Sequence, residues 1–198
     1  MNVLCFGDSI TAGTDFDEPD RWPSILQRLL DEFKPGAFHV FNLGMNGNTS
    51  AQGFDRLAKD AIPRMPAILV VEFGLNDSTV RDWAEAPRVG GDELKKNLRE
   101  FHRVATKAGG TCAFIANHIY LKPATRKPED PIYNPKIREV ASALKAPLAD
   151  LESMMKARRI EIARFVGDDG AHLSAEGNRL YAGMVFDALK AAGVWGAK

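Results

Sequence analysis

The sequence predicts an α/β protein, a three-layer α/β/α sandwich in which a mostly parallel sheet of about five strands lies between two helical layers. Short apolar runs typical of buried strands alternate with longer segments whose apolar residues recur at helical spacing. With 198 residues, 45% of them hydrophobic, the chain can bury a substantial core. We therefore expect one domain, over residues 1–198.

Each predicted element follows from a local pattern. The apolar runs that predict strands cover residues 2–7, 37–42, 67–73, 111–117 and 147–150. Cys5 and Cys112 lie inside two of these runs, which favours buried free thiols over a disulfide bond. Helical spacing is present over residues 22–33 and 94–108, and further helices are expected to begin at Asn134 and after Ser174. Strands that alternate with helices in this way predict parallel pairing.

The first apolar run ends at Gly7-Asp8-Ser9, which is typical of a sharp turn after a strand. Such a turn places the Ser9 hydroxyl where the sheet opens into a crevice. A serine hydroxyl is a poor nucleophile unless a neighbouring base accepts its proton. Near the other end of the chain, Asp169 precedes His172 at a spacing that suits a carboxylate orienting an imidazole base. A helix cap at Ser9 and a turn at Asp169 are the structural alternatives.

Two stretches between these motifs contain candidate hydrogen-bond donors for an oxyanion. Both follow predicted strands, so both should reach the edge of the sheet at which Ser9 lies. Gly47 can offer its backbone N–H because no Cβ blocks close approach, and Asn76 can offer a side-chain amide. The backbone N–H of Ser9 would be a third donor. Gly44 is the alternative to Gly47, and turn or cap roles are the structural alternatives for both stretches.

Taken together, these residues resemble the motif blocks of the GDSL-type esterases and lipases, also called SGNH hydrolases. The similarity runs from residue 3 to residue 172. It implies that Ser9 is the nucleophile, His172 the base and Asp169 the residue that orients the base. It also implies an oxyanion hole formed by Ser9, Gly47 and Asn76, and a flavodoxin-like arrangement of the sandwich.

The predicted function is therefore hydrolysis of a small-molecule carboxylic ester through an acyl-enzyme on Ser9. The sequence has no long apolar lid, which favours short acyl chains. The resemblance also permits carbohydrate O-deacetylase, thioesterase and lysophospholipase activities. A non-catalytic ligand-binding protein on the same fold is the alternative from a different functional class.

Two segments, residues 78–92 and 118–134, are expected to rim the cleft. Trp83 in the first segment could stack on a sugar or an aryl group, or it could plug the loop against the core, and we expect the plug. His118 follows the fourth strand at the ligand edge. Asp8, Trp83 and His118 are the candidate substrate contacts.

Composition narrows the possible partners. The chain has 26 basic and 26 acidic residues, so no general field favours nucleic acid or an anionic membrane. Met1 leads almost directly into the first strand and no apolar run has membrane length, so we expect no signal peptide, no membrane insertion and a cytoplasmic location. The four histidines lack metal-ligand spacing and there is no phosphate-binding loop, so neither a metal nor another cofactor is expected. The oligomeric state is not indicated.

Overall fold

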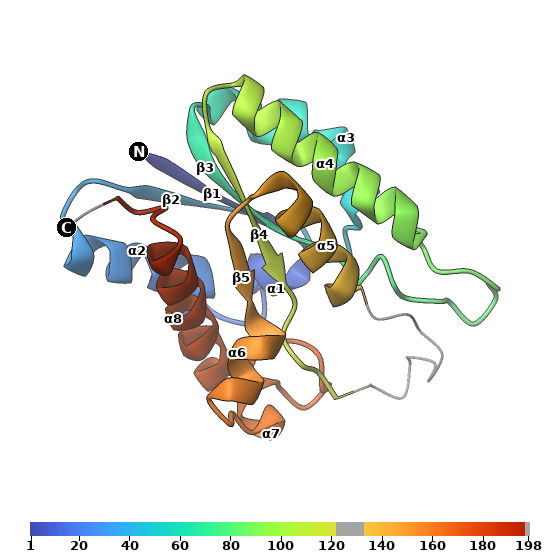
Figure 1. Cartoon of the computed structure of the whole chain (residues 1–198). Coiled ribbons are helices and arrows are strands. Elements are labelled where there is room, and N and C mark those ends of the chain that lie inside the picture. Colours follow the sequence, from blue (N-terminus) through green and yellow to red (C-terminus); the bar gives the residue numbers. More distant parts are fainter. Residues whose placement is uncertain (122–132, 197–198) are drawn as a thin grey trace.

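The computed structural model describes residues 1–121 and 133–196, and in this part of the chain the strands form one parallel sheet (Figure 1). The strands are β1 (Asn2–Gly7), β2 (His39–Gly44), β3 (Ala67–Glu72), β4 (Thr111–Ala116) and β5 (Leu148–Asp150). Their order is β2-β1-β3-β4-β5, which is the flavodoxin-like doubly wound order. The predicted fold class is confirmed. The largest shift in a strand start is at β2, which begins at residue 39 where residue 37 was predicted.

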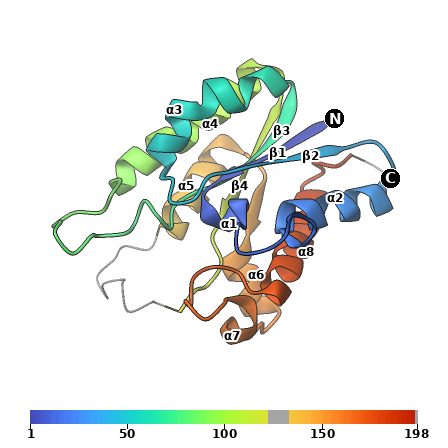
Figure 2. The ribbon, with the colours of Figure 1, turned by 180° about the vertical axis from the view of Figure 1, so that it is seen from behind.

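Helices cover both faces of the sheet (Figures 1 and 2). One face carries α3 (Ser50–Asp60), α4 (Gly91–Lys107) and α5 (Asn134–Leu144). The other carries α2 (Trp22–Phe33) and α8 (Ala175–Ala191), with α6 (Leu151–Ala157) and α7 (Ile162–Phe165) beside α8. The short helix α1 (Ser9–Ala12) lies at the carboxyl edge of the sheet, and two 3₁₀ turns, η1 (Glu18–Asp20) and η2 (Ile62–Arg64), complete the connections.

The sequence analysis did not predict α3, α6 or α7. Helix α3 is mostly polar, and it buries only Ser50, Gly53 and Leu57. Its one clear sequence signal is a capping box, in which the Thr49 side chain and the Gln52 side chain each accept from the other's backbone N–H. Residues 151–173, expected as a long loop, contain α6 and α7.

The core has two layers because side chains alternate between the two faces of each strand. In β1, Val3 and Cys5 face α2 and α8, whereas Leu4 and Phe6 face α3, α4 and α5. All four are fully buried, as expected for a strand in the middle of a covered sheet. Cys5, like Cys112 in β4, is a buried free thiol, as predicted.

Two glycines allow α1 to fold back over the ends of the strands. The parallel register pairs Gly7 with Gly44 on one side and with Glu72 on the other. A Cβ at Gly44 would lie 2.1 Å from the backbone N of Ala12, and one at Gly7 would lie 2.3 Å from Thr11 Oγ1. Contacts this short are sterically forbidden, so these positions require glycine for α1 to pack where it does.

Helix α1 is also held from below by Trp22, which is fully buried. The Trp22 indole Nε1 donates to the carbonyl oxygen of Ile10 at 3.0 Å. The Trp22 backbone N–H donates to Asn178 Oδ1 in α8, also at 3.0 Å. Helix α1 is therefore held in place by α2, which in turn is bonded to α8.

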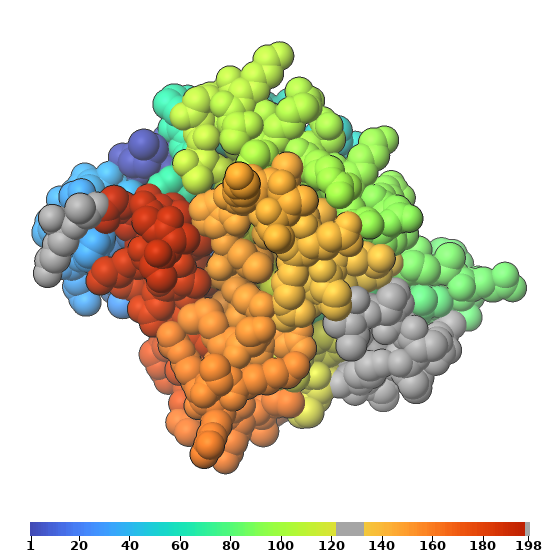
Figure 3. Space-filling view, in the orientation of Figure 1, coloured from blue at the N-terminus to red at the C-terminus, as the bar shows by residue number. Residues whose placement is uncertain are grey.

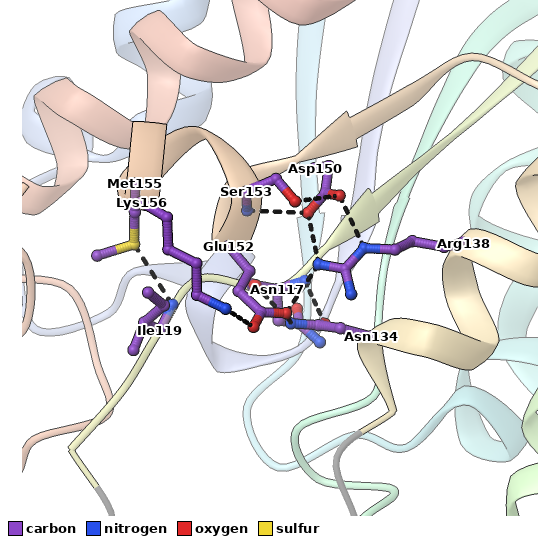
Figure 4. A network of polar contacts seen from close by, with 9 residues as sticks. All are labelled: Asn117, Ile119, Asn134, Arg138, Asp150, Glu152, Ser153, Met155 and Lys156. Atoms are coloured by element: carbon purple, nitrogen blue, oxygen red, sulfur yellow. Dashed lines mark hydrogen bonds and ion pairs between the residues drawn. The ribbon is translucent and has the colours of Figure 1, made fainter. Parts of the chain in front are cut away.

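A polar network connects α5, β5 and α6 (Figure 4). Arg138 of α5 donates to both carboxylate oxygens of Asp150, at 2.7 and 2.8 Å, and to Glu152 at 2.7 Å. Bidentate pairs of this kind are among the stronger polar contacts in proteins. The backbone N–H of Asn117, after β4, donates to Asn134 Oδ1 at 2.8 Å. The network therefore fixes the direction in which the chain leaves β4.

Among the residues that the structure describes, no helix combines the length and the apolar character needed to cross a lipid bilayer.

Candidate active site

Ser9 is the first residue of α1 and follows β1 directly after Gly7 and Asp8. The Asp8 carboxylate caps the helix by accepting the Ile10 N–H at 2.9 Å. The N–H of Ser9 belongs to the first turn, where backbone donors have no acceptor within the helix. The Ser9 hydroxyl lies 2.8 Å from His172 Nε2. The structure therefore brings together two predicted residues that are 163 positions apart.

The Asp169 carboxylate fixes the orientation of the His172 ring. One oxygen, Oδ2, pairs with His172 Nδ1, and the other accepts the backbone N–H groups of Ala171 and His172, each at 2.9 Å. Burial opposes the charged carboxylate, but these hydrogen bonds outweigh it and lower the pKa of Asp169 below its ordinary value. With Nδ1–H directed at Asp169, Nε2 is left to accept a proton from Ser9.

The candidate oxyanion donors follow β2 and β3. Gly47 has a φ of +71°, and a Cβ at this position would meet open space. Gly44, by contrast, is the last residue of β2 and lies against α1, which favours Gly47 as the donor. The Asn76 side chain borders the same cavity as Ser9 and His172, whereas Gly47 is not among the residues that line it.

This cavity has a volume of about 300 Å³. Its walls combine the polar groups of Ser9, Asn76 and His172 with Ile10, Leu75, Thr79 and Tyr120. Tyr120 belongs to the predicted rim segment 118–134, of which residues 122–132 lie outside the described residues. The other predicted rim segment contributes Thr79.

Asp8, a predicted substrate contact, is among the residues that line the cavity, but its carboxylate is directed at neighbouring protein groups. Asp8 is fully buried, and its two carboxylate oxygens are occupied, one by the Ile10 N–H and the other by the Asn76 amide at 2.9 Å. Burial raises the pKa of Asp8 to about 6, against the opposing effect of the Ile10 N–H. Asp8 is therefore placed to orient Asn76, and its contact with substrate stays a prediction.

Glu72 lies beneath this turn, and the sequence analysis missed it. It is fully buried at the end of β3, where its Oε2 accepts Thr11 Oγ1 at 3.0 Å and the Asp8 N–H at 3.3 Å. Its Oε1 has no hydrogen-bond partner within the described part of the chain. Burial, and then the neighbouring Asp8 carboxylate, raise the pKa of Glu72 well above its ordinary value. The sequence signal that could have identified Glu72 is an acidic residue at the end of an otherwise apolar strand.

The prediction that His118 lines the cavity is wrong. The side chain is 1% exposed and packs against Phe165 and Tyr181. Its Nε2 donates to the Ala171 carbonyl at 2.9 Å, which supports the turn that holds Asp169 and His172. Burial lowers the pKa of His118 to about 4, so the ring is neutral near pH 7.

The expectation that Trp83 plugs the loop against the core is also wrong. The Trp83 side chain is 79% exposed, the largest value among the exposed large hydrophobic residues of the described chain. The Arg81 guanidinium lies over the indole ring, 5.4 Å from its centroid. The alternative prediction, that the indole is available to a ligand, is therefore kept.

Two further contacts, absent from the sequence analysis, tie the donor segments together. Asp77 follows Asn76 and accepts both the backbone N–H of Ser50, at 3.0 Å, and the Ser50 hydroxyl. Arg88 donates from its guanidinium to the Gly47 carbonyl at 2.9 Å. These bonds link the segment after β2 to the segment after β3, so the two candidate donors are held in a fixed relation.

No group of three or more His, Cys, Asp and Glu side chains suited to a metal ion is present in the residues described, 1–121 and 133–196.

Comparison with known proteins finds a family whose profile covers most of the chain. The profile of the GDSL-like lipase/acylhydrolase family matches residues 5–180, which is most of the chain. Esterase TesA of Pseudomonas aeruginosa is 33% identical over 124 residues, covering 62% of this chain and 56% of that protein. An acetylxylan esterase of Xylanibacter ruminicola is 25% identical over 96% of this chain and 43% of its own length. An uncharacterized lipoprotein of Bacillus subtilis, YqeF, is 28% identical over 75% of this chain and 70% of its own length.

Solved structures show the same fold. The lipase/acylhydrolase from Enterococcus faecalis superposes with a TM-score of 0.79 at 24% identity, covering 96% of both chains. The acetyl xylan esterase AlAXEase superposes with a TM-score of 0.79 at 20% identity, covering 96% of this chain and 100% of its own. At these identities the similarity establishes the fold, and the chemistry has to be argued from the residues.

Proposed function

Because the chain belongs to the GDSL-like lipase/acylhydrolase family, we propose that it hydrolyses carboxylic esters through an acyl-enzyme on Ser9. The observation that carries this proposal is the 2.8 Å contact between Ser9 Oγ and His172 Nε2, with the imidazole oriented by Asp169. A nucleophile, a base and a group that orients the base are the requirements for acyl transfer by serine.

In the first step, His172 Nε2 takes the Ser9 proton as Oγ attacks the ester carbonyl, and the carbonyl oxygen becomes an anion. The Ser9 N–H, the Gly47 N–H and the Asn76 amide are the proposed donors to that anion. The tetrahedral intermediate then collapses, and the alcohol leaves with the proton from His172. Asp169 stabilises the imidazolium throughout.

In the second step, His172 takes a proton from a water molecule as the water attacks the acyl-enzyme. The same donors hold the new oxyanion, and the carbonyl re-forms as Ser9 Oγ leaves with the proton from His172. The carboxylic acid is released and the free enzyme is restored. No redox step or added group is required.

The size of the cavity supports short acyl chains. Its volume of about 300 Å³ is at the small end of the range of about 300 to 1,000 Å³ for ligand pockets. Leu75 and Ile10 supply apolar surface beside Ser9. A series of nitrophenyl esters from acetyl to dodecanoyl tests this point, with the highest kcat/KM expected at four carbons or fewer.

The decisive experiment compares Ser9→Ala with Ser24→Ala, whose exposed hydroxyl lies on α2 and bonds to Glu18. Ser9→Ala is expected to lower kcat for 4-nitrophenyl acetate by several orders of magnitude and to abolish labelling by a fluorophosphonate probe, whereas Ser24→Ala should do neither. A folded wild-type protein that takes no label and shows no turnover would instead favour a ligand-binding protein on this fold.

Two predictions from the sequence stay as proposals. We propose that residues 1–198 form a single domain, which one cooperative unfolding transition would support. A cytoplasmic location is likewise proposed, and fractionation of cells expressing the full-length protein tests it against the membrane attachment that the name of the lipoprotein relative implies for that protein.

A further inference from the structure

Residues 45–48, directly after β2, form a tight turn that contains Gly47. The Asn48 N–H donates to the Met45 carbonyl at 3.1 Å, which closes the turn. Gly47 has a φ of +71°, a backbone conformation that favours glycine. The position of such a short turn relative to the nucleophile depends on the contacts that hold its two ends. Both ends are connected to the same atom, the carbonyl oxygen of Gly7.

The first end of the turn contacts Gly7 directly. The Met45 N–H donates to the Gly7 carbonyl at 3.1 Å. Gly7 is the last residue of β1, and only Asp8 separates it from Ser9. The start of the turn is therefore bonded to the strand that ends at the nucleophile.

The second end of the turn is connected to Gly7 through Arg56. The Arg56 Nε donates to Asn48 Oδ1 and its Nη2 donates to the Gly7 carbonyl, both at 2.9 Å. Arg56 belongs to α3, which lies behind α4 in the views of Figures 1 and 3 and in front of it in Figure 2. One guanidinium thus bridges the last residue of the turn and the last residue of β1.

Further contacts fix the Arg56 side chain itself. It is 11% exposed, and its Nη1 pairs with Asp60 Oδ2 at 3.1 Å. Its guanidinium carbon lies 4.0 Å from the centroid of the buried Phe6 ring. The planar fork of donors and the stacking on an aromatic ring both favour arginine over lysine, whose ammonium is a single point charge. The bridge therefore depends on the shape of the guanidinium as well as on its charge.

We propose that Arg56 is a positioning residue for the oxyanion hole, which holds the Gly47 N–H in a fixed relation to the Ser9 hydroxyl. This proposal rests on the proposed esterase function and deepens it. Arg56 is not among the residues that line the cavity, so it acts on the reaction through Gly47. A displaced oxyanion donor weakens stabilisation of the transition state more than binding of the ester.

The kinetic test measures 4-nitrophenyl acetate hydrolysis by Arg56→Met and by Arg56→Lys, which keeps the charge. In both variants kcat should fall about tenfold while KM stays within about twofold of the wild type. The matched controls are the same substitutions at Arg64, which also lies over an aromatic ring and donates to a carbonyl, but adjoins Asn2 at the other end of β1. These controls should not change kcat. An unchanged kcat in both Arg56 variants, or a rise in KM alone, overturns the proposal.

A double-mutant cycle tests the bridge from its other end. Asn48→Ala removes the partner of Arg56 Nε and should lower kcat at least about threefold in the wild type. In Arg56→Met the same substitution should lower kcat by less than about twofold, because the bridge is already broken. Equal losses in the two backgrounds would overturn the proposal, since they would show that the two residues act independently.

Backbone hydrogen exchange provides a readout that does not require turnover. In Arg56→Met the Asn48 N–H should exchange at least about tenfold faster than in the wild type, whereas the amides of β1 should keep their rates. Unchanged exchange at Asn48, or acceleration that extends through β1, overturns the proposal, because the first shows a turn that needs no bridge and the second a general loss of stability. If the wild type hydrolyses no ester and takes no fluorophosphonate label, the esterase proposal fails, and the exchange rates still decide whether Arg56 fixes the turn.

Discussion

The substitution Asp8→Asn tests how the proposed oxyanion hole is built. Asp8 uses one carboxylate oxygen for the Ile10 N–H and the other for the Asn76 amide, both at 2.9 Å. An asparagine at residue 8 has only one oxygen, so one of these two donors must face an NH₂ group instead. Because the Ile10 N–H is fixed in α1 and the Asn76 side chain is only partly buried, we expect Asn76 to turn away.

The size of the effect follows from the loss of one preorganised donor. Removing an oxyanion donor costs about 10²- to 10³-fold in kcat. Because the donor acts on the transition state more than on the bound ester, KM should change little. The assay is 4-nitrophenyl acetate hydrolysis at pH 8, above the pKa of about 6 for Asp8.

A double-mutant cycle distinguishes positioning from general damage. If Asp8 acts through Asn76, then Asp8→Asn should lower kcat by less than threefold when introduced into Asn76→Ala, because the amide is already gone. Thermal unfolding of each variant controls for stability. A kcat for Asp8→Asn within threefold of the wild type, or an equal loss in both backgrounds, would refute the reasoning.

Two further predictions concern the surroundings of the site. Arg88→Met removes the hydrogen bond to the Gly47 carbonyl, which is worth about 0.5 to 1.5 kcal/mol, so kcat should fall about three- to tenfold. The control Arg28→Met removes an exposed arginine bond to the Pro19 carbonyl and should not change kcat. Equal activity of the two variants would contradict the role of Arg88. For Glu72, a raised pKa in the folded chain means that stability is greatest below its ordinary pKa of 4.5 and falls as pH rises, by at most about 1.4 kcal/mol per pH unit for one proton. Glu72→Gln has no proton to lose, so urea unfolding between pH 5 and 8 should show a flatter decline than the wild type, and parallel curves would contradict this assignment.

The parts of the fold that the sequence predicted are those with strong local patterns. Continuous apolar runs identified all five strands of the sheet, and the amphipathic helices α2, α4 and α8 were visible from their spacing. Helix α3 was missed because it lies against the sheet with Gly53, whose Cβ position is occupied by Phe73, so few large apolar residues mark its buried face. Helices α6 and α7 are too short for a periodic signal.

The residues of the site also divide into those that have a local sequence signal and those that do not. Ser9, Asp169 and His172 were found because their chemistry is carried by motifs, and the structure brings them together. Glu72 and Arg88 were not found because their importance depends on contacts between distant segments, which spacing along the chain does not reveal. Trp83 and His118 were placed wrongly for a related reason, since exposure depends on tertiary packing that a single sequence leaves open.

The double contact of Trp22, with Ile10 on one side and Asn178 on the other, has a consequence for biosynthesis. Ser9 is synthesised before α8, but the support under its turn is completed by that helix. A nascent chain that lacks α8 thus holds Ser9 without the full anchorage of its turn. Full reactivity towards esters should therefore arise only after α8 has been synthesised and has packed against α2.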